Sequence, residues 1–154
     1  MNREIYPDLS TQTFDQYFFT SIGRNGKILK AVIYTPIDYP NTYNLGMATV
    51  KYDEFGKAYL DGEDRTNNGD INLVLSTTAK TIEIYTTVFP ERKVYFQGYE
   101  PHLTKIYQRA IRNDYESIVK LYNMYGDKDD RDHHYRFEPF SLSEDYYGFL
   151  IERK

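Results

Sequence analysis

Apolar and aromatic residues gather in short runs in the first half of the chain, a pattern typical of β-strands. Two runs, Tyr17–Ile22 and Ile28–Tyr34, flank the turn residues Gly23–Gly26. The Asn-Gly pair in this turn favours a tight hairpin, because glycine and asparagine adopt positive φ readily. Two further runs, Met47–Tyr52 and Lys57–Asp61, follow with their own turn. The pattern predicts an antiparallel meander of four strands.

The period changes after Asn68, where apolar residues begin to recur at spacings of three and four, as on one face of a helix. The predicted inward positions are Ile71, Val74, Leu75, Thr78, Ile82, Tyr85 and Phe89. Asn68 or Asp70 can cap this helix by accepting a backbone N–H, and Pro90 marks its end. The following run, Lys93–Gln97, is the best candidate for a central strand.

A second helix is predicted from Pro101, since proline suits the first helical position. Its apolar face comprises Leu103, Ile106, Tyr107, Ala110 and Ile111. Asn113 or Asp114 can begin a third helix, with Gly126 as its C-cap. Two final strands are predicted over Tyr135–Phe140 and Tyr146–Ile151.

Taken together, these elements predict an α+β fold, a mostly antiparallel β-sheet of about six to seven strands with about three helices packed on one face. A chain of 154 residues suits a single domain over 1–154, with residues 1–12 as a candidate flexible N-terminus.

Composition adds three constraints. The chain holds 17 tyrosines and 9 phenylalanines but no tryptophan, so it can build an aromatic core and also present amphipathic surface. Its net charge of −4 argues against non-specific binding to nucleic acid or to anionic membranes. There is no cysteine, which excludes disulfides and thiolate chemistry and suits a reducing compartment. With no secretory signal or membrane-spanning run, we expect a cytoplasmic protein that does not bind membranes.

A set of short motifs resembles a family of small uncharacterised bacterial proteins that are catalogued as a domain of unknown function. The motifs are Asn67-Asn68-Gly69-Asp70, Val74-Leu75-Ser76-Thr77-Thr78, Phe89-Pro90, Gly98, Pro101, Thr104-Lys105-Ile106-Tyr107, Glu138-Pro139-Phe140 and Phe149-Leu150. They extend over nearly the whole chain. The resemblance implies a compact α+β domain and no particular activity. It also implies more arginine along the helix after Gly98 than this chain has, with Leu103 and Gln108 at two of those positions.

The predicted helix after Gly98 is the first candidate functional site. Its N-terminus favours an anion, because unpaired N–H groups and the helix dipole meet there. Positive or stacking side chains are supplied by His102, Lys105, Arg109, Arg112 and Tyr99. These residues could contact phosphate or nucleic acid, with Tyr99 available to stack on a base. The alternative without a function is that these residues form the solvent-exposed polar face of the helix.

Two further candidates are weaker. The loop 127–134 carries alternating carboxylates, but Arg131 and Asp132 stand where a calcium loop needs a ligand and a glycine. His133 and His134 with Asp130 could bind a transition metal, yet adjacent side chains rarely converge. We therefore predict no metal and no cofactor.

Acid–base chemistry would need His102, His133 or His134 to meet Glu138 or Asp145, and nothing in their spacing establishes this. No phosphate-binding loop, dinucleotide fingerprint or nucleophile elbow is present. The sequence therefore favours a protein that is not an enzyme and leaves its activity unknown.

The best functional hypothesis from sequence is a non-catalytic protein-interaction module of a bacterial protein pair, of the toxin–antitoxin or defence type. Tyrosine-rich strands and an acidic charge suit a protein partner. The alternative is a nucleic-acid-binding or nucleic-acid-cleaving domain that uses the basic helix after Gly98. A homo-oligomer stays open, since an unpaired edge strand could support one.

Overall fold

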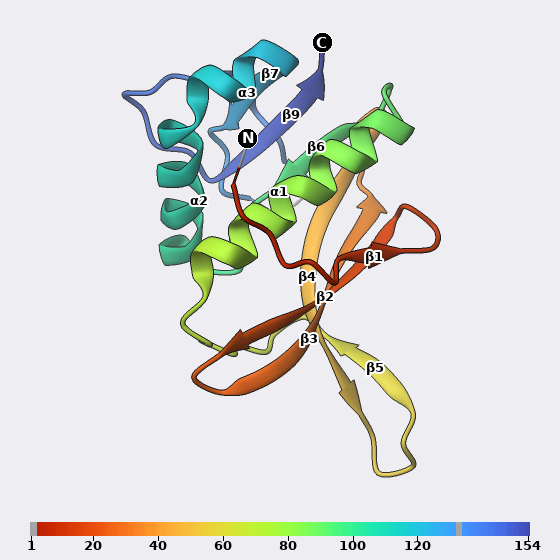
Figure 1. The fold of residues 1–154 in the computed structure, drawn as a ribbon. Coiled ribbons are helices and arrows are strands. Elements are labelled where there is room, and N and C mark those ends of the chain that lie inside the picture. The colour runs from red at the N-terminus through yellow and green to blue at the C-terminus, as the bar shows by residue number, and fades with distance from the viewer. Residues whose placement is uncertain (1–2, 132–133) are drawn as a thin grey trace. The chain divides into compact units, whose positions relative to one another are not determined.

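The fold is given by a computed structural model that describes residues 3–131 and 134–154 (Figure 1). These residues form two compact units, each with its own internal contacts. The α1 unit comprises residues 3–35 and 45–88, and the α2–α3 unit comprises the described residues of 36–44, 89–131 and 134–154.

In the α1 unit the elements are β1 (Ser10–Thr11), β2 (Gln16–Gly23), β3 (Gly26–Pro36), β4 (Thr42–Tyr52), β5 (Ala58–Asp61) and α1 (Ile71–Val88). The strands follow the order β1-β2-β3-β4, and β5 pairs with β4. The first three residues of β4 belong to the other unit.

Both predicted hairpins are confirmed. In the first, β2 and β3 pair up to Gly23 opposite Gly26, and Gly26 has the positive φ of 87° that the turn needs. In the second, β4 and β5 pair from Thr49 opposite Asp61 to Tyr52 opposite Ala58. The sequence pattern missed the two-residue strand β1, which is too short to show a period.

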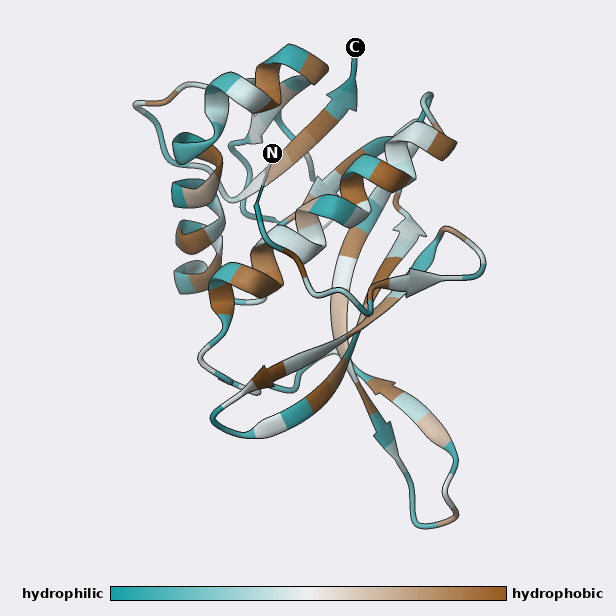
Figure 2. Ribbon diagram, viewed as in Figure 1, coloured by the Kyte–Doolittle hydropathy of each residue, from teal (hydrophilic) through white to brown (hydrophobic). Residues whose placement is uncertain are grey.

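The α1 helix has the predicted bounds, but its buried face differs from the prediction. Ile71 is 44% exposed, whereas the buried positions are Val74, Thr77, Thr81, Tyr85 and Thr86. Threonine can line a core when its hydroxyl bonds within the helix, as Thr77 Oγ1 does to the carbonyl of Leu73 at 2.7 Å. Figure 2 shows hydrophobic, intermediate and hydrophilic segments alternating along this helix. The prediction was right for Val74 and Tyr85, but it missed the three buried threonines Thr77, Thr81 and Thr86.

Aromatic rings fill the core of the α1 unit. The ring of Tyr34 stacks on that of Tyr85, with centroids 3.9 Å apart, and meets Tyr17 edge-on at 5.9 Å. Tyr6 stacks on Phe19 at 5.6 Å. All five side chains are buried, so part of the tyrosine content serves the core, with aromatic pairs adding to the energy of burial.

In the α2–α3 unit the elements are β6 (Lys93–Phe96), α2 (Pro101–Asn113), α3 (Tyr115–Leu121), β7 (Tyr122–Asp127), β8 (Phe137–Pro139) and β9 (Gly148–Arg153). The strands follow the order β4-β6-β9-β7-β8. The position of β6 between β4 and β9 confirms the predicted central strand. Its pairing with β4 is parallel, with Thr42 opposite Lys93, and its pairing with β9 is antiparallel.

The predicted role of Gly126 is wrong. The α3 helix ends at Leu121, its C-cap is Tyr122, and the chain continues directly into β7, where Gly126 pairs with Phe149. A Cβ atom on Gly126 would lie 2.1 Å from the ring of Tyr146. The glycine therefore makes room for an aromatic ring on the sheet and does not cap a helix.

The predicted fold class is confirmed: the fold is α+β with a mostly antiparallel sheet. Within residues 3–131 and 134–154 there are three helices and nine strands, two strands more than the seven of the sequence pattern. The additional strands are β1 and β7, and the pattern had assigned the start of β7 to the preceding helix. The single-domain prediction stays a prediction.

Candidate functional site

The α2 helix, which carries the basic residues, begins in a tightly packed corner. Its N-cap Glu100 is extended, with φ −145°, and makes no side-chain capping bond. The backbone N–H of Gly98 donates to Thr104 Oγ1 at 3.0 Å in a buried position. A Cβ atom on Gly98 would lie 2.5 Å from the backbone nitrogen of Thr104, so only glycine allows this close approach.

Three of the predicted site residues, His102, Lys105 and Arg109, share an exposed face of α2. Within the described part of the chain, no hydrogen bond or ion pair engages any of these three side chains. At neutral pH the lysine and the arginine are two uncompensated positive charges one helical turn apart. This face of α2 can therefore receive an anionic group.

Arg112 does not belong to this available surface. Its guanidinium donates to the backbone carbonyl of Glu144 at 2.8 Å and forms an ion pair of 3.3 Å with Asp145, whose side chain is 88% exposed. The loop between β8 and β9 thus neutralises the charge of Arg112. The sequence could not show this, since the acidic residues lie more than 30 positions further along the chain.

Gln108 on the same helix is a structural anchor that sequence reasoning passed over. It is 3% exposed, its Nε2 donates to the carbonyl of Glu144 at 2.6 Å, and its Oε1 accepts the backbone N–H of Tyr146 at 3.2 Å. The buried ridge of α2 consists of Thr104, Gln108 and Ile111. Two of these are polar, and a purely apolar pattern therefore missed them.

Tyr99, the proposed stacking residue, is 52% exposed just before α2. It lies close enough to Tyr107 to raise the pKa of that phenol, although burial of Tyr107 is the larger cause. Four of the predicted residues, His102, Lys105, Arg109 and Tyr99, thus remain as a modest basic and aromatic surface.

Two carboxylates of the acidic loop after β7, those of Asp127 and Asp129, have partners close by. Asp127 is buried, and its carboxylate accepts hydrogen bonds from the Tyr95 hydroxyl at 3.1 Å and from the backbone N–H groups of Asp129 and Arg136 at 3.0 Å. Arg131 pairs with Asp129 at 2.7 Å and holds the pKa of that carboxyl far below its usual range. No group of residues able to hold a metal ion occurs within 3–131 and 134–154. Asp132 and His133 lie outside the described residues.

The proposed acid–base pairs do not form among the described residues. Neither His102 nor His134 is hydrogen-bonded or ion-paired to Glu138 or Asp145 in this part of the chain. His134 lies near Asp129 instead, where it adds a minor contribution to the lowered pKa of that carboxyl.

A buried polar cluster in the α1 unit escaped the sequence analysis. Asp70, just before α1, accepts hydrogen bonds from Ser21 Oγ at 2.5 Å and from the hydroxyl of Tyr6. Lys30 is 6% exposed in β3, its Nζ donates to Thr49 Oγ1 at 2.9 Å, and burial lowers its pKa. The sequence feature that could have indicated this cluster is Lys30, a lysine within the apolar run of a predicted strand. Since Asp70 and Lys30 each have hydrogen-bond partners within the unit, these groups stabilise the fold and offer no open site.

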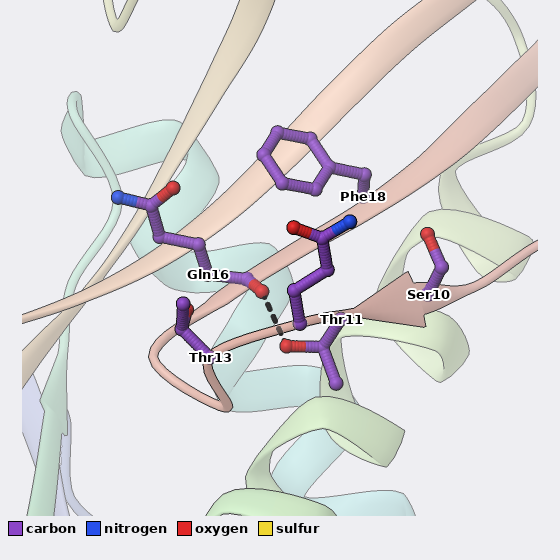
Figure 3. Close-up of a pocket in the computed structure, with 6 residues that line it drawn as sticks. Ser10, Thr11, Thr13, Gln16 and Phe18 are labelled. Carbon is purple, nitrogen blue, oxygen red and sulfur yellow. Dashed lines mark hydrogen bonds between the residues drawn. The ribbon is translucent and has the colours of Figure 1, made fainter.

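A pocket lies at the turn between β1 and β2 (Figure 3). Its lining residues are Ser10, Thr11, Gln12, Thr13, Gln16 and Phe18. Thr11 Oγ1 donates to the backbone carbonyl of Gln16 at 2.6 Å, which closes the turn. None of the lining side chains is titratable near neutral pH, so the pocket offers no side chain that could act as a general acid or base.

The chain belongs to the Family of unknown function (DUF6934), whose family model matches residues 2–154. This confirms the predicted resemblance to a domain of unknown function. No curated protein and no solved structure shows significant similarity to the chain. None of the helices in the described ranges is long and apolar enough to cross a membrane.

Proposed function

We propose that the protein is a non-catalytic protein-interaction module, one half of a bacterial protein pair of the toxin–antitoxin or defence type. The observation that carries the proposal is the exposed aromatic tip of the β4–β5 hairpin. Phe55 at the turn is 87% exposed and Tyr52 beside it is 63% exposed. Large aromatic side chains of this kind are the usual anchors of protein interfaces.

Hydrogen bonds within the turn itself stabilise the tip of the hairpin. The backbone N–H of Asp53 donates to the carbonyl of Lys57 at 2.9 Å, and Gly56 adopts a φ of 79°. The carboxylate of Asp53 accepts the backbone N–H groups of Phe55 and Lys57 at 2.9 and 2.8 Å. Binding through Phe55 would therefore cost little backbone entropy, which favours affinity.

The hairpin also has a charge preference. Residues 51–65 contain five acidic and three basic side chains, a net charge of −2. Lys51 is already paired with Asp61 at 2.9 Å and with Asp64 at 3.6 Å. A partner that places basic residues around an apolar pocket would complement this surface.

The test is quantitative capture by the tagged chain from the lysate of its native host at moderate salt. The double variant Tyr52→Ala/Phe55→Ala should lose a stoichiometric partner by about tenfold or more, as expected when interface anchors are truncated. Val88→Ala is the matched control, because Val88 is an exposed apolar residue outside the hairpin. Equal capture by all three proteins, or no stoichiometric partner at all, would refute the proposal.

A second candidate function is a nucleic-acid-binding or nucleic-acid-cleaving domain. It is favoured by the exposed side chains of Lys105 and Arg109 on α2, which make no hydrogen bond or ion pair within the described residues. Binding should weaken steeply with salt and be lost in Lys105→Ala/Arg109→Ala, but not in Lys27→Ala on β3. Filter binding to single- and double-stranded probes measures this, and salt-independent or absent binding would rule the candidate out.

A further inference from the structure

The outer edge of the β5 strand faces no other strand among residues 3–131 and 134–154. In the described part of the chain β5 pairs with β4 alone, along the register from Thr49–Asp61 to Tyr52–Ala58. Its residues Ala58, Tyr59 and Leu60 are exposed. Such an edge is a template for another strand, because its backbone donors and acceptors lack strand partners.

The hairpin register fixes which backbone groups face this edge. The N–H of Asp53 donates to the carbonyl of Lys57, which makes 53 and 57 a hydrogen-bonded pair. Hydrogen-bonded and non-hydrogen-bonded pairs alternate along an antiparallel ladder. Tyr59 is therefore hydrogen-bonded to β4, and the N–H and C=O groups of Ala58 and Leu60 point outward.

We infer that the outer edge of β5 binds a second copy of this chain, in antiparallel orientation, with the two-fold axis at Tyr59. In this arrangement Ala58 of each copy pairs with Leu60 of the other, and the outward groups form four backbone hydrogen bonds. The contact is isologous, so the same patch serves both copies. The inference goes beyond the proposed function and does not need another protein.

Charge complementarity selects this register. With the axis at Tyr59, Lys57 of each copy lies opposite Asp61 of the other, and the two tyrosine rings face each other as a close cross-strand pair. With the axis at Ala58, Lys57 would lie opposite Tyr59. With the axis at Leu60, Tyr59 would lie opposite Asp61, and the ladder would run into the turn that follows β5.

The carboxylate of Asp61 is ready for this role. Lys51 donates to Asp61 Oδ2 at 2.9 Å and lowers the pKa of the carboxyl, so the group is ionised at neutral pH. Within the described residues the Lys57 side chain has no hydrogen bond or ion pair. In the dimer, each Asp61 would be shared by Lys51 of its own copy and Lys57 of the other, which adds two ion pairs.

Cysteine cross-linking tests the axis directly, because the natural chain has no cysteine. Under mild oxidation, Tyr59→Cys should form a covalent dimer at least about tenfold faster than Leu60→Cys, since only position 59 meets itself across the axis. The Leu60 variant is the matched control on the neighbouring residue of the same edge. Equal rates for the two variants would overturn the inference.

Charge exchange provides an independent test in sedimentation equilibrium. Lys57→Glu and Asp61→Lys should each weaken self-association, because like charges would then face each other. An equimolar mixture of the two variants should associate at least as strongly as the natural chain, since opposite charges face each other again. A mixture as monomeric as its components, or charge variants that associate like the natural chain, would contradict the arrangement.

Discussion

Asn68 Oδ1 accepts a hydrogen bond of 2.6 Å from the backbone N–H of Asn25, 43 positions earlier in the chain. The Nδ2 of the same amide donates to Ser21 Oγ and to the carbonyl of Gly26, both at 3.0 Å. One buried side chain thus ties the loop before α1 to the turn between β2 and β3. Gly23 completes the contact, since a Cβ there would lie 1.9 Å from the carbonyl oxygen of Asn68.

Replacing this amide should be costly. Asn68→Ala leaves the N–H of Asn25 and the carbonyl of Gly26 without their partner, and we expect a loss of about 2–4 kcal/mol in the free energy of unfolding. Urea denaturation measures the loss. Asn72→Ala, at an exposed position in α1, is the control and should stay within about 0.5 kcal/mol of the natural chain. Equal stability of the two variants would show that the tie contributes nothing.

A methyl group on Gly126 should destabilise the α2–α3 unit. The added Cβ would meet the ring of Tyr146 at 2.1 Å, and overpacking of this kind costs about 2–3 kcal/mol. At Gly62 nothing lies within 4 Å of an added Cβ, so Gly62→Ala should be nearly neutral. Thermal unfolding compares the two. The double variant Gly126→Ala/Tyr146→Ala should lose less stability than the two single variants lose together, because the smaller side chain at position 146 removes the clash.

Two buried tyrosines should respond oppositely to loss of the hydroxyl. The Tyr17 hydroxyl is buried without a hydrogen-bond partner in the described part of the chain, so Tyr17→Phe should raise stability by about 1 kcal/mol. The Tyr34 hydroxyl lies 2.8 Å from Thr81 Oγ1, so Tyr34→Phe should lower it by a similar amount. Guanidinium denaturation of both variants decides the matter, and a loss of stability in Tyr17→Phe would contradict the expected sign.

Alkaline pH should weaken the fold through Tyr107. Burial raises the pKa of this phenol to about 12, against a usual value of 10.0, and Tyr99 adds a smaller effect. The unfolded chain then releases the proton first, so the stabilisation is complete below pH 10 and is lost as the pH rises from 10 toward 12. Tyr107→Phe should therefore show a shallower fall in melting temperature over this range. Tyr52→Phe, at an exposed position, is the control and should follow the natural chain.

Local pattern was sufficient where the environment of a residue is set by its neighbours in sequence. The hairpin at Gly23–Gly26 and the bounds of α1 depend on turn preferences and on periodicity. The family relationship also followed from short motifs along the chain. The basic face of α2 was predictable in the same way, because His102, Lys105 and Arg109 share one helical face by spacing alone.

The sequence by itself therefore determined the α+β class, most strands and helices, and three of the exposed basic residues of α2. The tertiary structure alone decided the strand role of Gly126, the three partners of Asn68 and the pairing of Arg112 with Asp145. It also left the outer edge of β5 without a strand partner in the part of the chain that the structure describes. These features depend on groups that are remote in sequence and meet only when the chain folds. Hydrogen bonding and close packing require groups to be near each other in space, and the periodicity of a short segment does not show which remote groups come together.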